Sequence, residues 1–183
     1  MNILRGALVL LSAASLAVCS RPSAEEPPAP PAAVESMALG LRLTSLPEGW
    51  SVAVGEGPRW AFAARAGEVQ GSATIELQEP ASAAVNLVEE AKAYGEAAAA
   101  APGGKFFGGN ELVTPYGSAY TVRVLVNRGL VEERAVLLLH PDGSGRLLKV
   151  GLRYPPGDGE TARARLLQAL ELVGALEPLA ATP

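Results

Sequence analysis

The sequence has one cysteine and one histidine among its 183 residues, and only 5% of its residues are aromatic. A lone histidine excludes a multi-histidine metal site within one chain. The shortage of aromatic rings leaves little material for the stacking surfaces that bind single-stranded nucleic acid. The net charge of −4 provides no general attraction to phosphate backbones. We therefore expect no nucleic-acid partner, no bound metal and no cofactor.

The first 18 residues have the pattern of an export signal. Arg5 supplies a positive charge, and the run from Gly6 to Val18 is apolar and uncharged. A membrane-spanning helix needs about 20 apolar residues, whereas this run is shorter and is followed by Arg21 and a proline-rich tract. We interpret residues 1–18 as a signal peptide that directs secretion.

Cys19 closes this apolar run. The stretch Leu16-Ala17-Val18-Cys19 resembles the bacterial lipobox, in which a diacylglycerol group is attached to the cysteine thiol, the signal is cut before it and the new amino terminus is acylated. Val18 departs from that family, which usually has Gly, Ala or Ser there. The resemblance predicts a lipid anchor at Cys19. Ordinary cleavage after Ala17 is the alternative and would leave an unpaired thiol on a secreted or periplasmic protein.

Residues 19–38 are predicted to form the lipidated cysteine and a Pro/Ala-rich tether, whose prolines are Pro22, Pro27, Pro28, Pro30 and Pro31. Such segments favour the extended polyproline II conformation and act as semi-rigid spacers. In the lipoprotein family an Asp after the cysteine often retains the protein in the inner membrane. Ser20 therefore favours the outer membrane, where the organism has one.

Residues 39–178 are predicted to form a single α+β domain, and residues 179–183 a flexible tail. Short segments between Gly and Pro clusters, or with alternating apolar residues, indicate strands; they are Leu39–Leu46, Trp50–Val54, Arg59–Ala64, Ser72–Gln78, Gly117–Val126, Leu130–His140 and Arg146–Tyr154. Apolar stripes of helical period predict a helix over Ser82–Ala100 and a second one that begins near Asp158 or Thr161 and ends by Pro178. Because the connections between strands are short, we expect an antiparallel sheet covered on one face by two helices.

The order of these elements resembles the PsbP-like fold, an α/β/α sandwich. The residues that carry the resemblance are Pro47, Gly49 and Trp50 in "LPEGW" and the stretch Gly117–Arg123 in "YGSAYTVRV". The resemblance implies a sheet covered on both faces. It also implies protein binding rather than catalysis, because that is the common theme of the families that share the fold.

Candidate functional residues are few. We interpret His140 as a solvent-facing turn residue, because it precedes Pro141 at the end of a predicted strand. The glycine-rich stretch Gly103–Asn110 follows a helix and precedes a strand, whereas a phosphate-binding loop leads into a helix, so we interpret it as a mobile loop. Within it, one of Phe106 and Phe107 is expected in the core and the other as an exposed partner contact.

Glu132 and Glu133 are adjacent on a predicted strand, so their side chains point to opposite faces and cannot act together on one substrate. We interpret them as charges that protect an edge strand. Trp50 and Trp60 are expected in the core, and Cys19 lies on a tether, where it cannot be a preorganised nucleophile. No catalytic residue is therefore predicted.

These observations favour a membrane-tethered, noncatalytic protein-binding or scaffold lipoprotein of the bacterial cell envelope. Its expected partners are the membrane, through lipid on Cys19, and another envelope protein. The alternative is a small-molecule carrier, or a small carboxylate-based enzyme, with its site near residues 103–110.

Overall fold

A computed structural model of the chain describes residues 33–54, 58–64, 71–80 and 84–179. The predicted signal peptide, Cys19 and the proline-rich tract lie outside the described residues. All described residues belong to one compact unit, residues 31–183.

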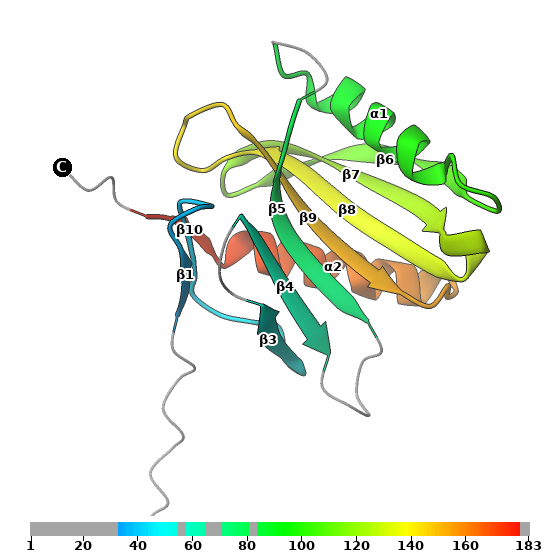
Figure 1. Ribbon diagram of the computed structural model, residues 1–183, viewed down its shortest axis with the longest axis horizontal. Helices are drawn as coiled ribbons and strands as arrows, with labels where there is room; N and C mark the ends of the chain where they lie inside the picture. The colour runs from blue at the N-terminus through cyan, green and yellow to red at the C-terminus, as the bar shows by residue number, and fades with distance from the viewer. Residues whose placement is uncertain (1–32, 55–57, 65–70, 81–83, 180–183) are drawn as a thin grey trace, which may run out of the picture. The chain divides into compact units, whose positions relative to one another are not determined.

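A large antiparallel sheet forms the centre of this unit (Figure 1). Its seven strands are β3 (Trp50–Val54), β4 (Arg59–Ala64), β5 (Ser72–Gln78), β6 (Lys105–Thr114), β7 (Gly117–Val126), β8 (Val131–Leu139) and β9 (Leu147–Tyr154). Their order across the sheet is β3-β4-β5-β9-β8-β7-β6. The predicted α+β class and the antiparallel sheet are confirmed.

Two helices lie on opposite faces of this sheet, α1 (Leu87–Ala99) and α2 (Gly159–Gly174) (Figure 1). Alternate residues of β8 separate the two cores: Leu137 packs in the cluster with Ala91 of α1, and Leu138 packs in the cluster with Leu172 of α2. The expectation from strand connections that both helices cover one face is wrong. The two-sided arrangement implied by the PsbP-like resemblance is the one observed.

Helix α1 begins later than the predicted Ser82, because Asn86 caps it. The Asn86 side chain accepts hydrogen bonds from the backbone N–H groups of Val88 and Glu89. Helix α2 begins after Asp158, whose carboxylate accepts from the N–H of Thr161, and this cap was one of the two predicted. An aspartate or asparagine at this position satisfies amide groups that have no partner within the helix.

Strand β6 occupies the glycine-rich stretch that was interpreted as a mobile loop. It is an edge strand with a bulge between Phe106 and Gly109. Gly108 has a φ of +90°, which favours glycine, and a Cβ on Gly109 would clash with the carbonyl oxygen of Thr121. Gly108 and Gly109 therefore serve a β-bulge, whereas Gly103 and Gly104 lie in the turn between α1 and β6.

A small second sheet has the order β1-β2-β10, from β1 (Val34–Ser36), β2 (Leu41–Leu43) and β10 (Leu176–Pro178). Because β1 pairs with β2, ordered structure reaches into residues 19–38, which were predicted to be a tether. The expectation that the fold begins near Leu39 is therefore wrong, since β1 precedes that residue.

The larger hydrophobic core lies between the sheet and α2. Trp50 and Trp60 are 5% and 0% exposed, so both predicted core positions are confirmed. Their burial accounts for two of the few aromatic side chains, which leaves Phe107 as a conspicuous exposed ring at 43%.

Candidate functional site

Strand β8 carries two adjacent buried carboxylates that point to opposite faces of the sheet. Glu132 and Glu133 are each 1% exposed. β8 lies between β9 and β7, so the interpretation of this pair as protection for an edge strand is wrong. A buried carboxylate is stable only where cations and hydrogen-bond donors surround it, and each of these two has its own set of partners.

The first set, the Glu133 network, lies on the α1 face and consists of Glu133, Tyr94, Lys149, Arg153, Glu76 and Arg59. Lys149 Nζ is 2.6 Å from Glu76 Oε1 and 3.7 Å from Glu133 Oε1. Arg153 Nε donates to Glu133 Oε2 at 2.7 Å. Arg59 Nε is 3.1 Å from Glu76 Oε2 at the outer end. Three cations thus share two carboxylates across β4, β5, β9 and β8.

Tyr94 of α1 closes the Glu133 network. Its hydroxyl donates to Glu133 Oε1, and Lys149 Nζ lies 3.2 Å from the same hydroxyl. Burial, together with the charge of Glu133 and its hydrogen bond, holds the pKa of Tyr94 far above its ordinary value. The phenol of Tyr94 therefore stays protonated. Lys149 contacts Glu76, Glu133 and Tyr94, and these contacts favour a structural role for the network.

The second set, the Glu132 cluster, lies on the α2 face and consists of Glu132, Arg123, Arg134, Tyr154 and Arg165. Arg123 holds both oxygens of Glu132, through Nε at 2.7 Å and Nη2 at 2.9 Å. The hydroxyl of Tyr154 donates to Glu132 Oε1 at 2.8 Å. The guanidinium carbon of Arg165 lies 5.3 Å from the centre of the Tyr154 ring, which is within cation–π distance.

The pKa values of this cluster follow from burial and from the contacts with Glu132. Burial raises the pKa of Tyr154, and the hydrogen bond to Glu132 and its charge raise it further, to about 12. Burial also acts to raise the pKa of Glu132, but the hydrogen bonds from Arg123 and Tyr154 outweigh it, so that pKa lies below its ordinary value. Glu132 is therefore a carboxylate at neutral pH.

Phe106 and Phe107 lie on opposite faces of β6, beside these two sets. Phe106 is partly buried and packs against the α1 core. Phe107 is exposed, with Lys105 Nζ 4.8 Å and the Arg123 guanidinium carbon 4.7 Å from its ring centre. The structure thus places one ring in the core and one at the surface; a partner contact at Phe107 stays a prediction.

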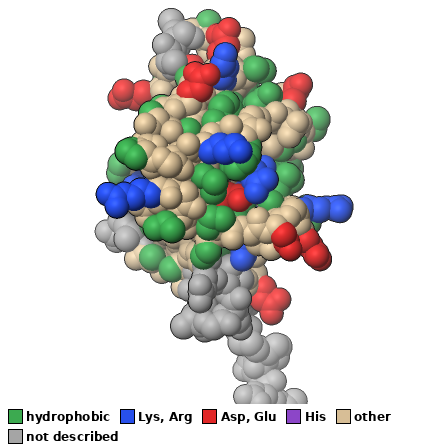
Figure 2. Space-filling model, turned by 90° about the vertical axis from the view of Figure 1, so that its right-hand side faces the viewer, with side chains coloured by type: hydrophobic (Ala, Val, Ile, Leu, Met, Phe, Trp, Pro, Cys, Tyr) green, Lys and Arg blue, Asp and Glu red, His purple; other side chains and the backbone are tan. Residues whose placement is uncertain are grey.

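Figure 2 shows the end of the molecule that lies on the right in Figure 1, where β7 and β9 end and β6, β8 and α2 begin. Lys and Arg side chains border hydrophobic side chains across the middle of this face. Arginine and aromatic side chains are enriched at protein–protein interfaces, and an exposed apolar patch can mark a binding surface.

Two clefts open on the described residues, the second of them where β9 ends and β8 begins. One, of about 390 Å³, lies at the start of α1 and includes Val88, Tyr120 and Leu139 in its lining. The other, of about 420 Å³, includes Leu130, Arg153 and Pro155. Neither lining includes residues 103–110, where the alternative carrier or enzyme site was expected.

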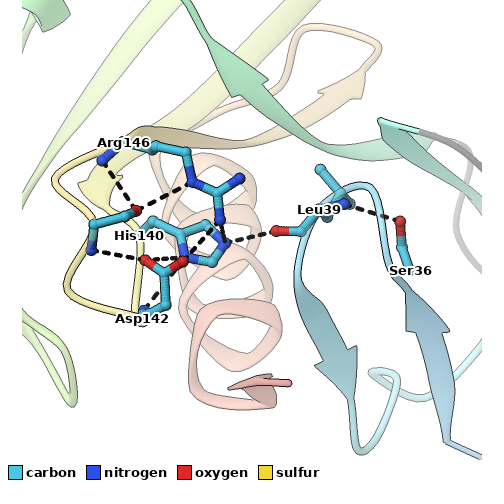
Figure 3. Close-up of polar contacts among 6 residues, drawn as sticks. Ser36, Leu39, His140, Asp142 and Arg146 are labelled. Carbon is cyan, nitrogen blue, oxygen red and sulfur yellow. Dashed lines mark hydrogen bonds and ion pairs between the residues drawn. The ribbon is translucent and has the colours of Figure 1, made fainter. Parts of the chain in front are cut away.

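His140 is buried, at 2% exposure, so its interpretation as a solvent-facing residue is wrong. Figure 3 shows its ring between Asp142 and the carbonyl group of Leu39. Its Nε2 lies 2.7 Å from the carbonyl oxygen of Leu39, and its Nδ1 lies 2.7 Å from Asp142 Oδ1. Arg146 Nη2 donates to the other oxygen of Asp142 at 2.8 Å. His140 therefore ties the β8–β9 loop to the turn that precedes β2.

We expect Asp142→Asn to lower the free energy of unfolding by about 2 kcal/mol at pH 7, as for a charged hydrogen-bond partner. Burial acts to raise the pKa of Asp142, but hydrogen bonds from Ser144, Arg146 and His140 outweigh it, so the folded-state pKa is below the unfolded value. The stabilisation is then present above pH 4 and declines as the pH falls below about 4. Urea unfolding at pH 7, 4 and 3 measures this decline, and a difference between Asp142→Asn and the parent that stays constant with pH would contradict it.

Other classes of site find no support among residues 33–54, 58–64, 71–80 and 84–179. No three side chains of His, Cys, Asp and Glu in these segments gather as a metal-ligand set. None of the helices in the described part of the chain is long and apolar enough to cross a membrane.

The architecture is a Mog1/PsbP-like α+β fold. No protein-family model matches the chain, and no curated protein does. Among solved structures, it is similar to the Ran-binding protein Mog1p of Saccharomyces cerevisiae, with a TM-score of 0.53, 14% identity and coverage of 76% of this chain and 90% of that one. It is also similar to the cyanobacterial PsbP (CyanoP) of Synechocystis sp. PCC 6803, with a TM-score of 0.52, 13% identity and coverage of 78% and 88%. At this identity the likeness establishes the fold.

Sequence reasoning missed most members of both charged sets. The alternation of Ser72–Gln78 placed Glu76 on a polar face, but nothing local indicated that Lys149 would pair with it. Arg123 and Arg134 lie directly opposite each other on β7 and β8. Two like charges in a cross-strand pair are unfavourable, and aligning the predicted strands through their short turn would have revealed this signal.

Proposed function

We propose that this chain is a noncatalytic protein-binding module of the bacterial cell envelope, held at a membrane by lipid on Cys19. The observation that carries the binding role is Phe107, an exposed ring on an edge strand between two cations. A fold neighbour described as Ran-binding adds support for a protein partner. The lipid anchor is supported by the lipobox-like Leu16–Cys19 and by the proline-rich tract that follows.

The binding role is supported over the carrier or enzyme at residues 103–110 by the conformation of that segment. It contains the start of strand β6, and the carboxylate of Glu132 is engaged by Arg123 and Tyr154. Exposed aromatic side chains beside arginine are enriched at protein interfaces.

The binding role is tested by chemical crosslinking in intact cells, followed by purification of the chain. We expect Phe107→Ala to reduce the co-purified envelope protein about tenfold, as for loss of an interface anchor. Leu167→Ala is the matched control, because Leu167 is an exposed apolar side chain on α2. Equal recovery with both variants, or a chain recovered only as a free species, would contradict the proposal.

For the anchor, we expect Cys19→Ser to move the chain from the membrane fraction to the soluble fraction and to abolish incorporation of labelled palmitate. Several acyl chains at about 0.8 kcal/mol per buried methylene account for the attachment before substitution. Ser23→Ala, which alters the same segment but keeps the thiol, should leave both measurements unchanged. Retention of Cys19→Ser on membranes would contradict a lipid anchor.

A further inference from the structure

We infer that the surface formed by Lys105, Phe107, Arg123, Arg134 and Arg165 binds an acidic segment of a partner protein. The inference rests on the proposed protein-binding function and specifies its chemistry. Carboxylates of the partner would meet the guanidinium and ammonium groups, and an apolar side chain of the same segment would cover Phe107.

The first argument is the imbalance of charge on this face. Three guanidinium groups, from Arg123, Arg134 and Arg165, surround the Glu132–Tyr154 pair, which supplies one carboxylate. Three positive charges against one negative charge leave an excess of two, and Lys105 beside Phe107 adds a third. This excess occurs on a chain whose net charge is −4, so it is a local feature that composition does not explain.

The second argument is hydrogen bonding. The Nε atoms of Arg134 and Arg165 are buried and have no hydrogen-bond partner. Arg123 donates hydrogen bonds from Nε and Nη2 to Glu132, and Arg165 donates one from Nη1 to Gln168. Buried donors without acceptors are costly. These two Nε atoms are shielded from solvent, so an added carboxylate would meet the three arginines where their side chains are partly exposed.

The third argument comes from the opposite face of the same strand. In the Glu133 network, Lys149 and Arg153 contact Glu133, and Lys149 and Arg59 contact Glu76. Three cations there share two carboxylates. The two faces of β8 therefore differ in how fully their cations are neutralised. The face beside Phe107 has fewer acidic partners for its cations, because Glu132 is the one carboxylate of its charged set.

The exposed ring of Phe107 favours a protein segment over a simple anion as the ligand of this surface. A free phosphate would satisfy the cations but would leave the exposed ring in water. A peptide with neighbouring acidic and apolar side chains matches both parts of the surface, since the ring lies within 5 Å of two cationic groups. Edge strand β6 also leaves one side of its backbone unpaired in the described sheet, which an extended peptide can use.

The test uses the purified full chain, labelled with ¹⁵N, and three probes. They are the peptide Glu-Glu-Trp-Glu-Glu, the neutral peptide Gln-Gln-Trp-Gln-Gln and inorganic phosphate. We expect the acidic peptide to shift the amide resonances of Lys105, Phe107 and Arg123, with a dissociation constant of about 0.1–1 mM. Raising the salt from about 50 to 300 mM should weaken binding several-fold, because the contacts are between charges.

Two variants with exposed side chains avoid disturbing the buried Glu132. Lys105→Glu should weaken binding of the acidic peptide about tenfold, and Phe107→Ala about fivefold. The control is Lys92→Glu, the same change of charge at an exposed lysine of α1, which should alter the dissociation constant by less than about twofold.

Equal binding of the acidic and neutral peptides, or resonance shifts confined to other residues, would overturn the inference. Phosphate that binds as tightly as the acidic peptide and competes with it would identify a small-anion site instead and would also overturn it. If Phe107→Ala abolishes co-purification in cells while Lys105→Glu and salt have no effect, the proposed function stands and the acidic specificity fails. If Phe107→Ala leaves co-purification unchanged, the proposed function fails, whatever the peptides do.

Discussion

Replacing Lys149 with methionine is expected to lower the free energy of unfolding by about 3–5 kcal/mol, the cost of removing one partner from a buried ion pair. Lys149 is 5% exposed, and Glu133, one of its two carboxylate partners, is 1% exposed. Methionine fills a similar volume, so the loss reports the unpaired carboxylates rather than a cavity. Urea unfolding followed by circular dichroism at pH 7 measures it.

The control for the stability of Lys149→Met is Lys92→Met. Lys92→Met removes the same charge from an exposed position on α1, 3.9 Å from Glu96. It should change stability by less than about 0.5 kcal/mol. If the two variants lose stability equally, the Glu133 network does not depend on Lys149.

Glu132→Ala is expected to cost about 3–5 kcal/mol, for the same class of reason on the other face. Without the carboxylate, Arg123 loses both of its hydrogen bonds to Glu132, and the hydroxyl of Tyr154 loses its acceptor. The three neighbouring arginines then repel one another with no negative charge between them.

Glu132→Gln separates charge from hydrogen bonding. The amide oxygen can still accept from Tyr154, so we expect this variant to lose about half as much stability as Glu132→Ala. Glu111→Gln, an exposed glutamate on β6, is the control and should be nearly neutral. A loss of less than about 1 kcal/mol for Glu132→Ala would contradict the role of Glu132 as the neutralising group of the cluster.

The strands that could be predicted are those in which the alternation of apolar and polar residues, or the turn residues at each end, agrees with the structure. Ser72–Gln78 alternates apolar and polar residues because one face of β5 packs in the core and the other carries Glu76. Turn residues on either side also delimited Trp50–Val54 and Arg59–Ala64. In each case the information lies within a few residues of sequence.

Strand β6 could not be predicted because its glycines have a tertiary cause. Gly109 is required by the close approach of Thr121 on β7, and Gly108 by the bulge. Both look like loop residues when β7 is not yet in place. Strand connections alone predicted both helices on one face for a similar reason, since adjacent residues of β8 pack into two different cores. The resemblance to the PsbP-like fold implied the two-sided arrangement.

The two charged sets and the burial of His140 could not be predicted because their contacts join distant parts of the chain. Tyr94 and Glu133 are 39 positions apart, and His140 and Leu39 are 101 apart. Glutamate is rarely fully buried unless it is paired, and histidine is intermediate in burial. Here partners from α1, β9 and the turn before β2 make burial of these side chains possible.

Site-specific photocrosslinking in intact cells tests the protein-binding role of this surface most directly. A benzophenone side chain replaces Phe107 in one variant and the exposed Leu167 in another, and adducts are resolved by mass after irradiation. The account predicts a discrete protein adduct from position 107, none from position 167, and loss of the position 107 adduct when Lys105→Glu is added. No adduct at position 107, or the same adducts at both positions, would contradict it.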